Sequence, residues 1–320
     1  MNEIRRANLF TAWAQLLEAG IPHAAIVEHL KRASTGAAAQ QIVDALAMAA
    51  RDGEGAAAAF SRLQDDVVPR VHREVLAAAE RSGHVGEALR GLAADDRLEA
   101  EHRAQLLRPG IYPVFMFHFA TLAPNAGGLV THPLATLLHV LLVVLPIDFA
   151  LVVFARILLG TGGPSLPGRL GLSIPYLARS VRARDHARYF RALHRLYEAG
   201  VPIRDAVQSA LPAVGSEPVR AELADAIAPV LAGDAFALMV SRIRGLESDA
   251  SLCLTTAEPS GALGDGLDQA ASLSRATWIR TGQRIARVVG HVLYGAAVIY
   301  AVARIAGFWS DYFSQFSKLR

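Results

Sequence analysis

The chain contains the same pattern twice, and this duplication constrains its fold more than any other feature. The sequence LLEAGIP at residues 16–22 returns as LYEAGVP at residues 196–202. A second stretch, AERSGHVG at 79–86, matches AEPSGALG at 257–264. Both pairs keep an offset of about 180 positions, and landmarks that share an offset indicate a duplicated domain rather than chance similarity.

Each copy has the pattern of a helical bundle. Apolar residues at helical spacing lead up to Gly20 and to Gly200, where a left-handed C-terminal cap is expected before the next helix starts near Pro22 or Pro202. Alanine-rich helices are expected at about 37–51 and 219–231. Runs that alternate β-branched and polar residues are scarce, which argues against a sheet.

A second turn recurs towards the end of each copy. A helix is expected to end at Glu80 or Glu258, followed by a tight turn through Gly83 or Gly261 and a last helix. We expect each carboxylate to accept hydrogen bonds from backbone N–H groups of the following turn or to cap the next helix, with contact to a partner as the less favoured alternative. The structural turn residues are Gly20, Glu80, Gly83, Gly200, Glu258 and Gly261.

The composition indicates a membrane protein. Hydrophobic residues make up 52% of the chain and charged residues only 19%, whereas roughly a quarter of the residues in soluble domains are charged. The excess lies in three segments, 109–122, 134–160 and 288–309. About 20 apolar residues are needed to cross a bilayer, so the first segment is long enough only if it continues towards Val130. The sequence predicts three membrane helices.

The positive charges predict the topology. Residues 1–8 lead into an amphipathic segment rather than the apolar core of a signal peptide, so the amino terminus is expected to stay cytoplasmic. Arginines before the first apolar segment, after the second and before the third agree with this orientation. The expected order is a cytoplasmic bundle (1–108), two membrane helices with a short outside loop (109–160), a linker (161–181), a second cytoplasmic bundle (182–284), a third membrane helix (285–309) and a tail (310–320).

Asp148 is the residue hardest to explain by composition. It lies near the middle of the second apolar segment, where a carboxylate costs roughly 2.5 to 3.5 kcal/mol. It is expected to face protein, with His118 or His291 as its partner. We favour a structural role for Asp148, as a contact that holds the membrane helices together or as part of an oligomer interface. The alternative is a role in a proton pathway or as a coupling element. Arg156 and Arg304 are expected to extend towards the membrane surfaces.

No pattern for catalysis or cofactor binding was found in the sequence. The two lysines, Lys31 and Lys318, are not preceded by glycine, which excludes a P-loop. The glycine-rich stretch 160–165 is predicted to be a flexible linker. The histidines do not have the spacing of a metal site, and Cys253 is expected to be a core residue. We expect no catalytic residue, no cofactor, no metal and no nucleic-acid partner.

The duplicated Ala-Gly-Ile/Val-Pro turn, the Glu-x-Ser-Gly turn and their placement before apolar helices resemble the inner-membrane platform family of type II secretion and type IV pilus machines. The resemblance covers nearly the whole chain and implies an all-α integral membrane protein with two homologous six-helix cytoplasmic bundles and three transmembrane helices. It also implies a non-enzymatic, multi-pass protein of the bacterial inner membrane.

By this resemblance, the protein would couple a cytoplasmic ATPase motor to pilin or pseudopilin assembly. The partners that the resemblance implies are a hexameric assembly ATPase, pilins or pseudopilins, other inner-membrane assembly components and a second copy of the chain. Arginines of the second bundle that are expected to be exposed are candidate contacts for acidic partner surfaces: Arg182, Arg184, Arg188 and Arg191. The alternative function is a small membrane transporter or a proton-conducting subunit that uses Asp148.

Overall fold

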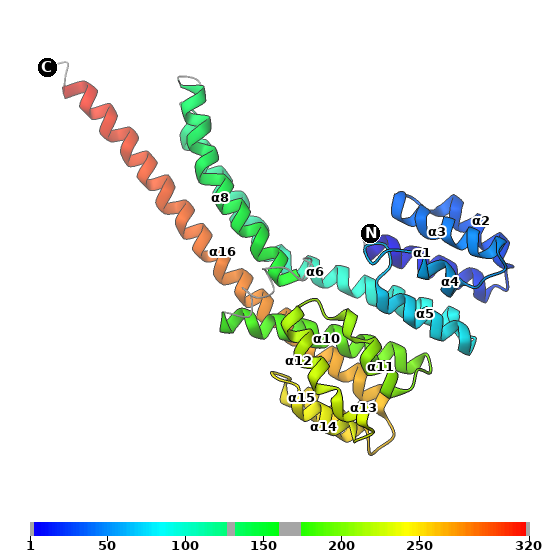
Figure 1. Ribbon diagram of the computed structural model, residues 1–320. Coiled ribbons are helices and arrows are strands. Elements are labelled where there is room, and N and C mark those ends of the chain that lie inside the picture. Colours follow the sequence, from blue (N-terminus) through cyan, green and yellow to red (C-terminus); the bar gives the residue numbers. More distant parts are fainter. Residues whose placement is uncertain (1–2, 127–131, 160–173, 318–320) are drawn as a thin grey trace. The chain divides into compact units, whose positions relative to one another are not determined.

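A computed structural model describes residues 3–126, 132–159 and 174–317, and no strand occurs in these ranges. Figure 1 shows the helices, which belong to two compact units. The first unit comprises Met1–Arg103 and Gly162–Trp278, and the second comprises Ala104–Thr161 and Ile279–Arg320. Two long helices, α6 and α16, begin in the first unit and end in the second.

The first repeat consists of six helices: α1 (Glu3–Glu18), α2 (His23–Ala33), α3 (Ala37–Arg51), α4 (Ala56–Ser61), α5 (Arg70–Ser82) and α6 (Val85–Leu122). Helix α1 ends at Glu18, and the turn after it passes through Gly20, whose φ of +70° only glycine adopts at little cost. The N–H of Ile21 then donates to the carbonyl of Leu16. Pro22 is the N-cap of α2 and not, as the sequence suggested, part of its first turn.

The second repeat consists of α10 (Pro175–Glu198), α11 (Ile203–Ser209), η2 (Leu211–Ala213), α12 (Glu217–Ala226), α13 (Ala228–Ala232), α14 (Phe236–Arg242), α15 (Ser248–Ala257) and α16 (Leu263–Ser317). The expected alanine-rich helix 219–231 is wrong as one helix, because it is divided at Ile227 into α12 and α13. Pro229 causes the break: it has no N–H to donate, and its ring would clash with the preceding turn.

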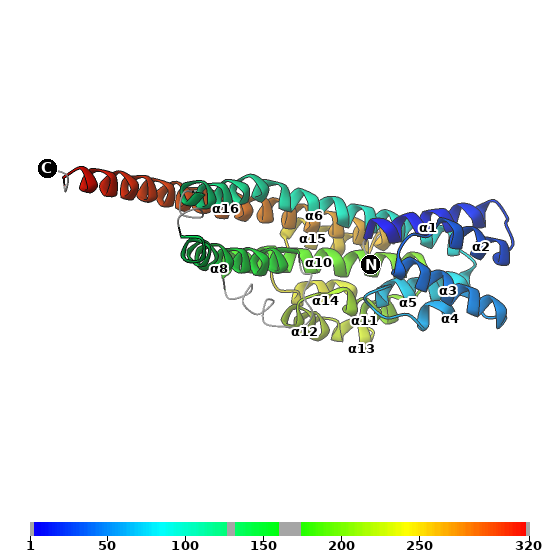
Figure 2. The same cartoon turned by 90° about the horizontal axis from the view of Figure 1, so that it is seen from above.

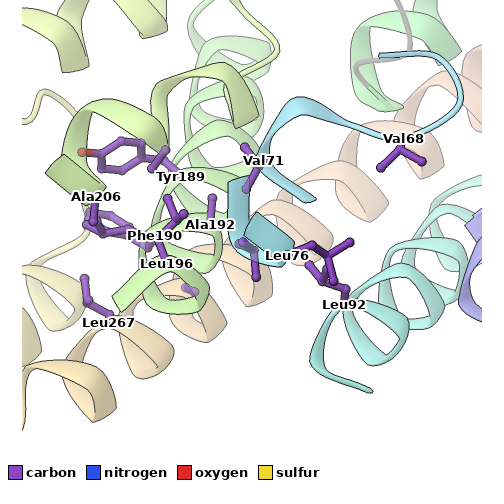
Figure 3. Packing of buried hydrophobic residues seen from close by; sticks show 14 of the residues in the cluster. Val68, Val71, Leu76, Leu92, Tyr189, Phe190, Ala192, Leu196, Ala206 and Leu267 are labelled. Carbon is purple, nitrogen blue, oxygen red and sulfur yellow. The ribbon is translucent and has the colours of Figure 1, made fainter. Parts of the chain in front are cut away.

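The two repeats share one hydrophobic core instead of forming separate bundles. Figure 3 shows residues of both repeats packed together, with Leu76 of α5 near Ala192 and Leu196 of α10. Tyr189 is fully buried, and its hydroxyl donates to the carbonyl of Val207 at 3.1 Å. Because a fully buried large apolar side chain contributes about 1.5–3 kcal/mol, this shared core makes the repeats one folding unit.

The second unit contains three helical segments: the end of α6, α8 (Pro133–Leu159) and the end of α16. A short turn, η1 (Ala123–Asn125), follows α6. Side chains of all three segments form a small apolar cluster that includes Phe117, Leu293 and Ile147. Figure 2 shows α6 running alongside α16. The apolar end of α6 therefore packs against the two longer apolar helices.

Two helices in the described ranges are long and apolar enough to cross a membrane, namely α8 and α16 up to Gly307. Their apolar side chains are widely exposed: 83% for Leu134 and 71% for Ile299. The third expected span, 109–122, does not meet this criterion. It is the end of the 38-residue α6, whose earlier part, residues 87–108, carries many charged residues, and it contains Pro109 and Pro113.

Some expected boundaries differ from the observed ones. The expected linker 161–181 is helical from Pro175 onwards, because proline is well suited to the first turn of a helix. The expected tail is helical through Ser317, as part of α16. The glycine-rich stretch 160–165, part of the outside loop and residues 318–320 lie outside the described residues.

Candidate functional site

Oppositely charged side chains join the two repeats inside the first unit. Asp95 and Glu99 lie one turn apart on α6, and α10 presents Arg188, Arg191 and Arg195 to them. Arg188 Nη2 lies 2.6 Å from Glu99 Oε1, and Arg195 Nε lies 2.8 Å from Asp95 Oδ2. We call these five residues the charged seam. The seam links α10 to the helix of the first repeat that continues into the second unit.

Burial makes the pairing in the charged seam strong. Burial alone would raise the pKa of Glu99, but the Arg188 guanidinium, helped by Arg103, lowers it to about 2. Burial alone would lower the pKa of Arg188. The carboxylates of Glu99 and Asp185 outweigh this effect and raise the pKa of the Arg188 guanidinium. Both groups therefore stay charged at neutral pH, and each is held in place by the other.

The four arginines expected to be exposed partner contacts are paired within the molecule. Arg182 pairs with Glu222, Arg184 with Asp185, Arg188 with Glu99 and Arg191 with Asp268. Only 3% of Arg184 is exposed, and the other three side chains are at most 23% exposed. The expectation of exposure is wrong, because acidic residues of other helices pair with Arg182, Arg188 and Arg191, while Arg184 is buried beside Asp185 of its own helix. These arginines stabilise the first unit.

The two recurring glutamates cap helices that precede them in the chain. Glu80 accepts hydrogen bonds from the N–H groups of Ala56 and Ala57 at the start of α4, both at 2.8 Å. Glu258 accepts them from Phe236 and Ala237 at the start of α14. The expected partner, the following turn, is wrong. The first N–H groups of a helix have no partner within the helix and lie at the positive end of its dipole. Each carboxylate therefore stabilises the start of a short helix, α4 or α14, through the same pair of hydrogen bonds.

We predict that Glu80→Ala lowers the free energy of unfolding by about 1–3 kcal/mol, because two partly buried N–H groups at the start of α4 lose a charged acceptor. Gly55→Ala should have a similar effect, since an added Cβ would overlap the Glu80 carboxylate. Thermal unfolding of the purified protein measures both. Gly86→Ala is the control, because its Cβ would meet only Glu18 Oε1, at 3.9 Å. Equal stability of Glu80→Ala and wild type would contradict the assignment.

Asp148 lies beside His118 in the second unit. The distance from His118 Nε2 to Asp148 Oδ2 is 3.3 Å, and His118 Nδ1 donates to the carbonyl of Val114. His291, the other expected partner, donates its Nδ1–H to the carbonyl of Arg287. One of the two expected partners is therefore in contact with Asp148, and the contact joins α6 to α8.

A second polar cluster in this unit could not be foreseen from the sequence. Tyr300 Oη of α16 lies 2.9 Å from Asn125 Nδ2 and 3.2 Å from His139 Nε2 of α8. Arg304 donates from Nη2 to Asn125 Oδ1 at 2.7 Å, although it was expected to extend towards the membrane surface. Polar side chains that bond across helices hold apolar helices in register. The only sequence signal is the position of polar residues within apolar segments.

Close packing of α6 against α16 depends on a glycine. A Cβ added at Gly290 would lie 3.1 Å from Pro113 Cγ and 3.9 Å from the carbonyl oxygen of Pro109. Small residues let membrane helices approach each other closely. Gly295, one and a half turns further along, has open space around it.

We predict that Gly290→Leu lowers the stability of the second unit by about 1–3 kcal/mol, because the larger side chain forces α6 away from α16. Thermal unfolding in detergent measures this change. Gly295→Leu adds the same side chain to the same helix and should have little effect. If the two variants were equally stable, close packing at Gly290 would not matter.

The described residues contain no group of three or more histidine, cysteine, aspartate or glutamate side chains that could hold a metal ion. The charged seam is made of ion pairs, and the repeated positions are helix caps and turns. This arrangement can hold helices together and transmit a displacement between them.

Comparison with protein families gives a match on both repeats. The family described as type II secretion system (T2SS), protein F matches residues 9–130 and 189–307, which is more than half of the chain. The chain belongs to this family. A search of curated proteins found no match. Proteins of the protein F family are inner-membrane platform proteins and are not known enzymes, and the two apolar helices are consistent with this location.

The boundaries of the family match agree with the structural repeat. The first matched segment ends in the apolar end of α6 and the residues that follow it, and the second ends within the apolar part of α16. Helix α8 lies outside both matches. Each copy of the protein F pattern thus consists of one helical repeat whose last helix continues into the second unit.

Proposed function

We propose that this protein F family member is the inner-membrane platform of a type II secretion or type IV pilus machine, and that it couples a cytoplasmic ATPase motor to the assembly of pilins or pseudopilins. One observation carries the proposal: two repeats fused through one core, from which α6 and α16 continue as unbroken helices into the apolar unit. A displacement applied to either repeat would therefore be transmitted to two helices of the apolar unit.

The proposed topology has three membrane helices and keeps both repeats in the cytoplasm. The end of α6 is the third membrane helix, because it corresponds to the apolar end of α16 in the family match and shares the apolar cluster around Phe117. A second copy of the chain and other inner-membrane assembly components are further proposed partners. The protein itself has no catalytic role in this proposal.

Deletion of the gene in its host, followed by measurement of pilus formation and protein secretion, tests the proposal. We expect loss of one of these activities and its return on expression of the wild-type chain. The full-length protein purified in detergent should also retain the assembly ATPase. Unchanged pilus formation and secretion in the deletion strain would overturn the proposal.

Helix continuity gives a sharper test of coupling. Three glycines inserted after Trp278, at the boundary between the units on α16, should abolish assembly while membrane insertion and ATPase retention persist. The control places the same insertion after Thr35, in the connection between α2 and α3, where assembly should persist. Normal assembly with the insertion after Trp278 would mean that α16 does not transmit motion.

The contact between His118 and Asp148 favours one alternative, a proton-conducting subunit. A titratable pair inside an apolar unit is a typical element of a proton path. Proton flux in proteoliposomes, lost in Asp148→Asn, would support this alternative. We expect no flux, with Asp148 acting as a link between α6 and α8.

A further inference from the structure

A group of arginines lies at the start of the apolar part of the second unit. Helix α16 carries Arg280, Arg284 and Arg287, and α6 carries Arg108. All four side chains are exposed. The three on α16 follow the spacing i, i+4 and i+7, which places them on one face of the helix.

The two helices bring Arg108 and Arg287 to nearly the same level, and Arg284 and Arg280 precede Arg287 by about one and two turns of α16. Gly290 of α16 lies against Pro113 and the carbonyl oxygen of Pro109 on α6. Arg287 comes one turn before Gly290, and Arg108 directly precedes Pro109. The end of α6 and the adjoining part of α16 therefore present positive side chains together, just before both helices become apolar.

Carboxylates are absent from the sequence around this group. Residues 104–122 and 269–310 contain no aspartate or glutamate, although they include most of the second unit's share of α6 and α16. The local charge is therefore strongly positive, and it attracts anions whatever the net charge of the whole chain. Guanidinium groups bind phosphate through paired, directional hydrogen bonds.

The side chains that follow the arginines are those of a membrane interface. Val288, directly after Arg287, is 64% exposed, and Ile111 of α6 is 65% exposed. Tyr112 and Tyr294, 62% and 44% exposed, lie in the next turns. Tyrosine concentrates at the level of lipid head groups, where its ring meets hydrocarbon and its hydroxyl meets water.

We propose that Arg108, Arg280, Arg284 and Arg287 bind the phosphate head groups of anionic phospholipids in the leaflet that faces the two repeats. The inference rests on the membrane helices of the proposed function. A lipid surface fits better than an acidic protein, because the arginines adjoin the exposed apolar belt within one or two helical turns and a protein would have to displace the head groups already there.

The test uses the full-length protein purified in detergent and stripped of lipid. It is incubated with phosphatidylglycerol or phosphatidylcholine, and the lipid retained after a second purification is quantified by mass spectrometry. We expect at least fivefold more phosphatidylglycerol than phosphatidylcholine per chain. The variant R108Q/R284Q/R287Q should lose most of this preference.

The control variant R51Q/R204Q/R242Q removes three exposed arginines from the first unit and should retain wild-type preference. Inorganic phosphate at millimolar concentration should not displace the lipid. Equal retention by the two variants, equal retention of both lipids, or displacement by phosphate would each overturn the proposal. Treatment of membranes with alkaline carbonate distinguishes failure of this proposal from failure of the proposed function. Release of the protein would show that its apolar helices do not span the membrane, whereas retention with no lipid preference would contradict only the lipid-binding proposal.

Discussion

Replacing Arg188 by alanine is expected to lower the free energy of unfolding of the first unit by about 3–5 kcal/mol. The change leaves Glu99 buried and charged without the guanidinium that lies 2.6 Å from it. Removing one member of a buried pair costs more than the pair contributes in net stability, because the remaining charge has lost its water as well as its partner. The shift in thermal unfolding temperature of the purified protein measures this effect.

The matched control is Arg179→Ala, on the same helix. Arg179 also pairs with a carboxylate, Glu247, but 70% of its side chain is exposed, so water replaces the lost partner. We expect a change below about 1 kcal/mol for this control. In the double variant E99Q/R188Q neither residue carries a charge, and it should be more stable than Arg188→Ala. A small effect of Arg188→Ala would mean that the charged seam does not hold the repeats together.

Mild acid is expected to destabilise the first unit between pH 7 and pH 5, through two buried histidines. Burial, with a smaller contribution from Arg6, lowers the pKa of His72 to about 3, and burial lowers that of His186 to about 4. Unfolded histidine titrates near 6.5, so in this range the unfolded chain binds more protons and stability falls as the pH falls. The loss by pH 5 is about 2 kcal/mol for each histidine.

Single variants isolate this contribution. Thermal unfolding temperatures of wild type, His72→Phe and His186→Phe are measured from pH 7 to pH 5, and each variant should show a weaker dependence than wild type. The raised pKa values of Glu3 and Asp96, which are due to burial, act in the opposite direction, so the comparison is made between variant and wild type. Glu99 affects the pH dependence of stability only below about pH 4.5, where the stabilisation from its lowered pKa is lost as its carboxylate becomes protonated towards pH 2. His29→Gln, at an exposed position, is the control and should follow wild type.

Local features were the most predictable from the sequence. The turn at Gly20 requires a positive φ that glycine adopts readily, and the same residue type recurs at Gly200 with φ of +84°. The break before Pro229 has an equally local cause, since proline cannot continue a helix, but the alanine-rich pattern led to the wrong prediction of one continuous helix. Such features depend on neighbouring residues alone.

Contacts between distant residues were not predictable in this way. Arg188 meets Glu99 across 89 positions, and Asn125 meets Tyr300 across 175. A row of arginines on a helix gives the same sequence pattern whether it faces water or an acidic face of another helix. Only the packing of one repeat on the other decides between these cases. Because of this packing, Arg188 and Arg191, which were predicted to contact a partner, belong to the charged seam inside the first unit.

The contacts between α6 and α16 relate equivalent parts of the two copies. Pro113 meets Gly290, and Asn125 meets Tyr300, so positions about 177 residues apart lie side by side on helices that run in the same direction. A parallel homodimer whose two subunits were joined into one chain would have this arrangement. In the proposed topology, the ends of α6 and α16 cross the bilayer in the same direction, and this requires one crossing back between them. In that topology, α8, which lies outside both family matches, would be the return segment that a fusion of two such subunits needs.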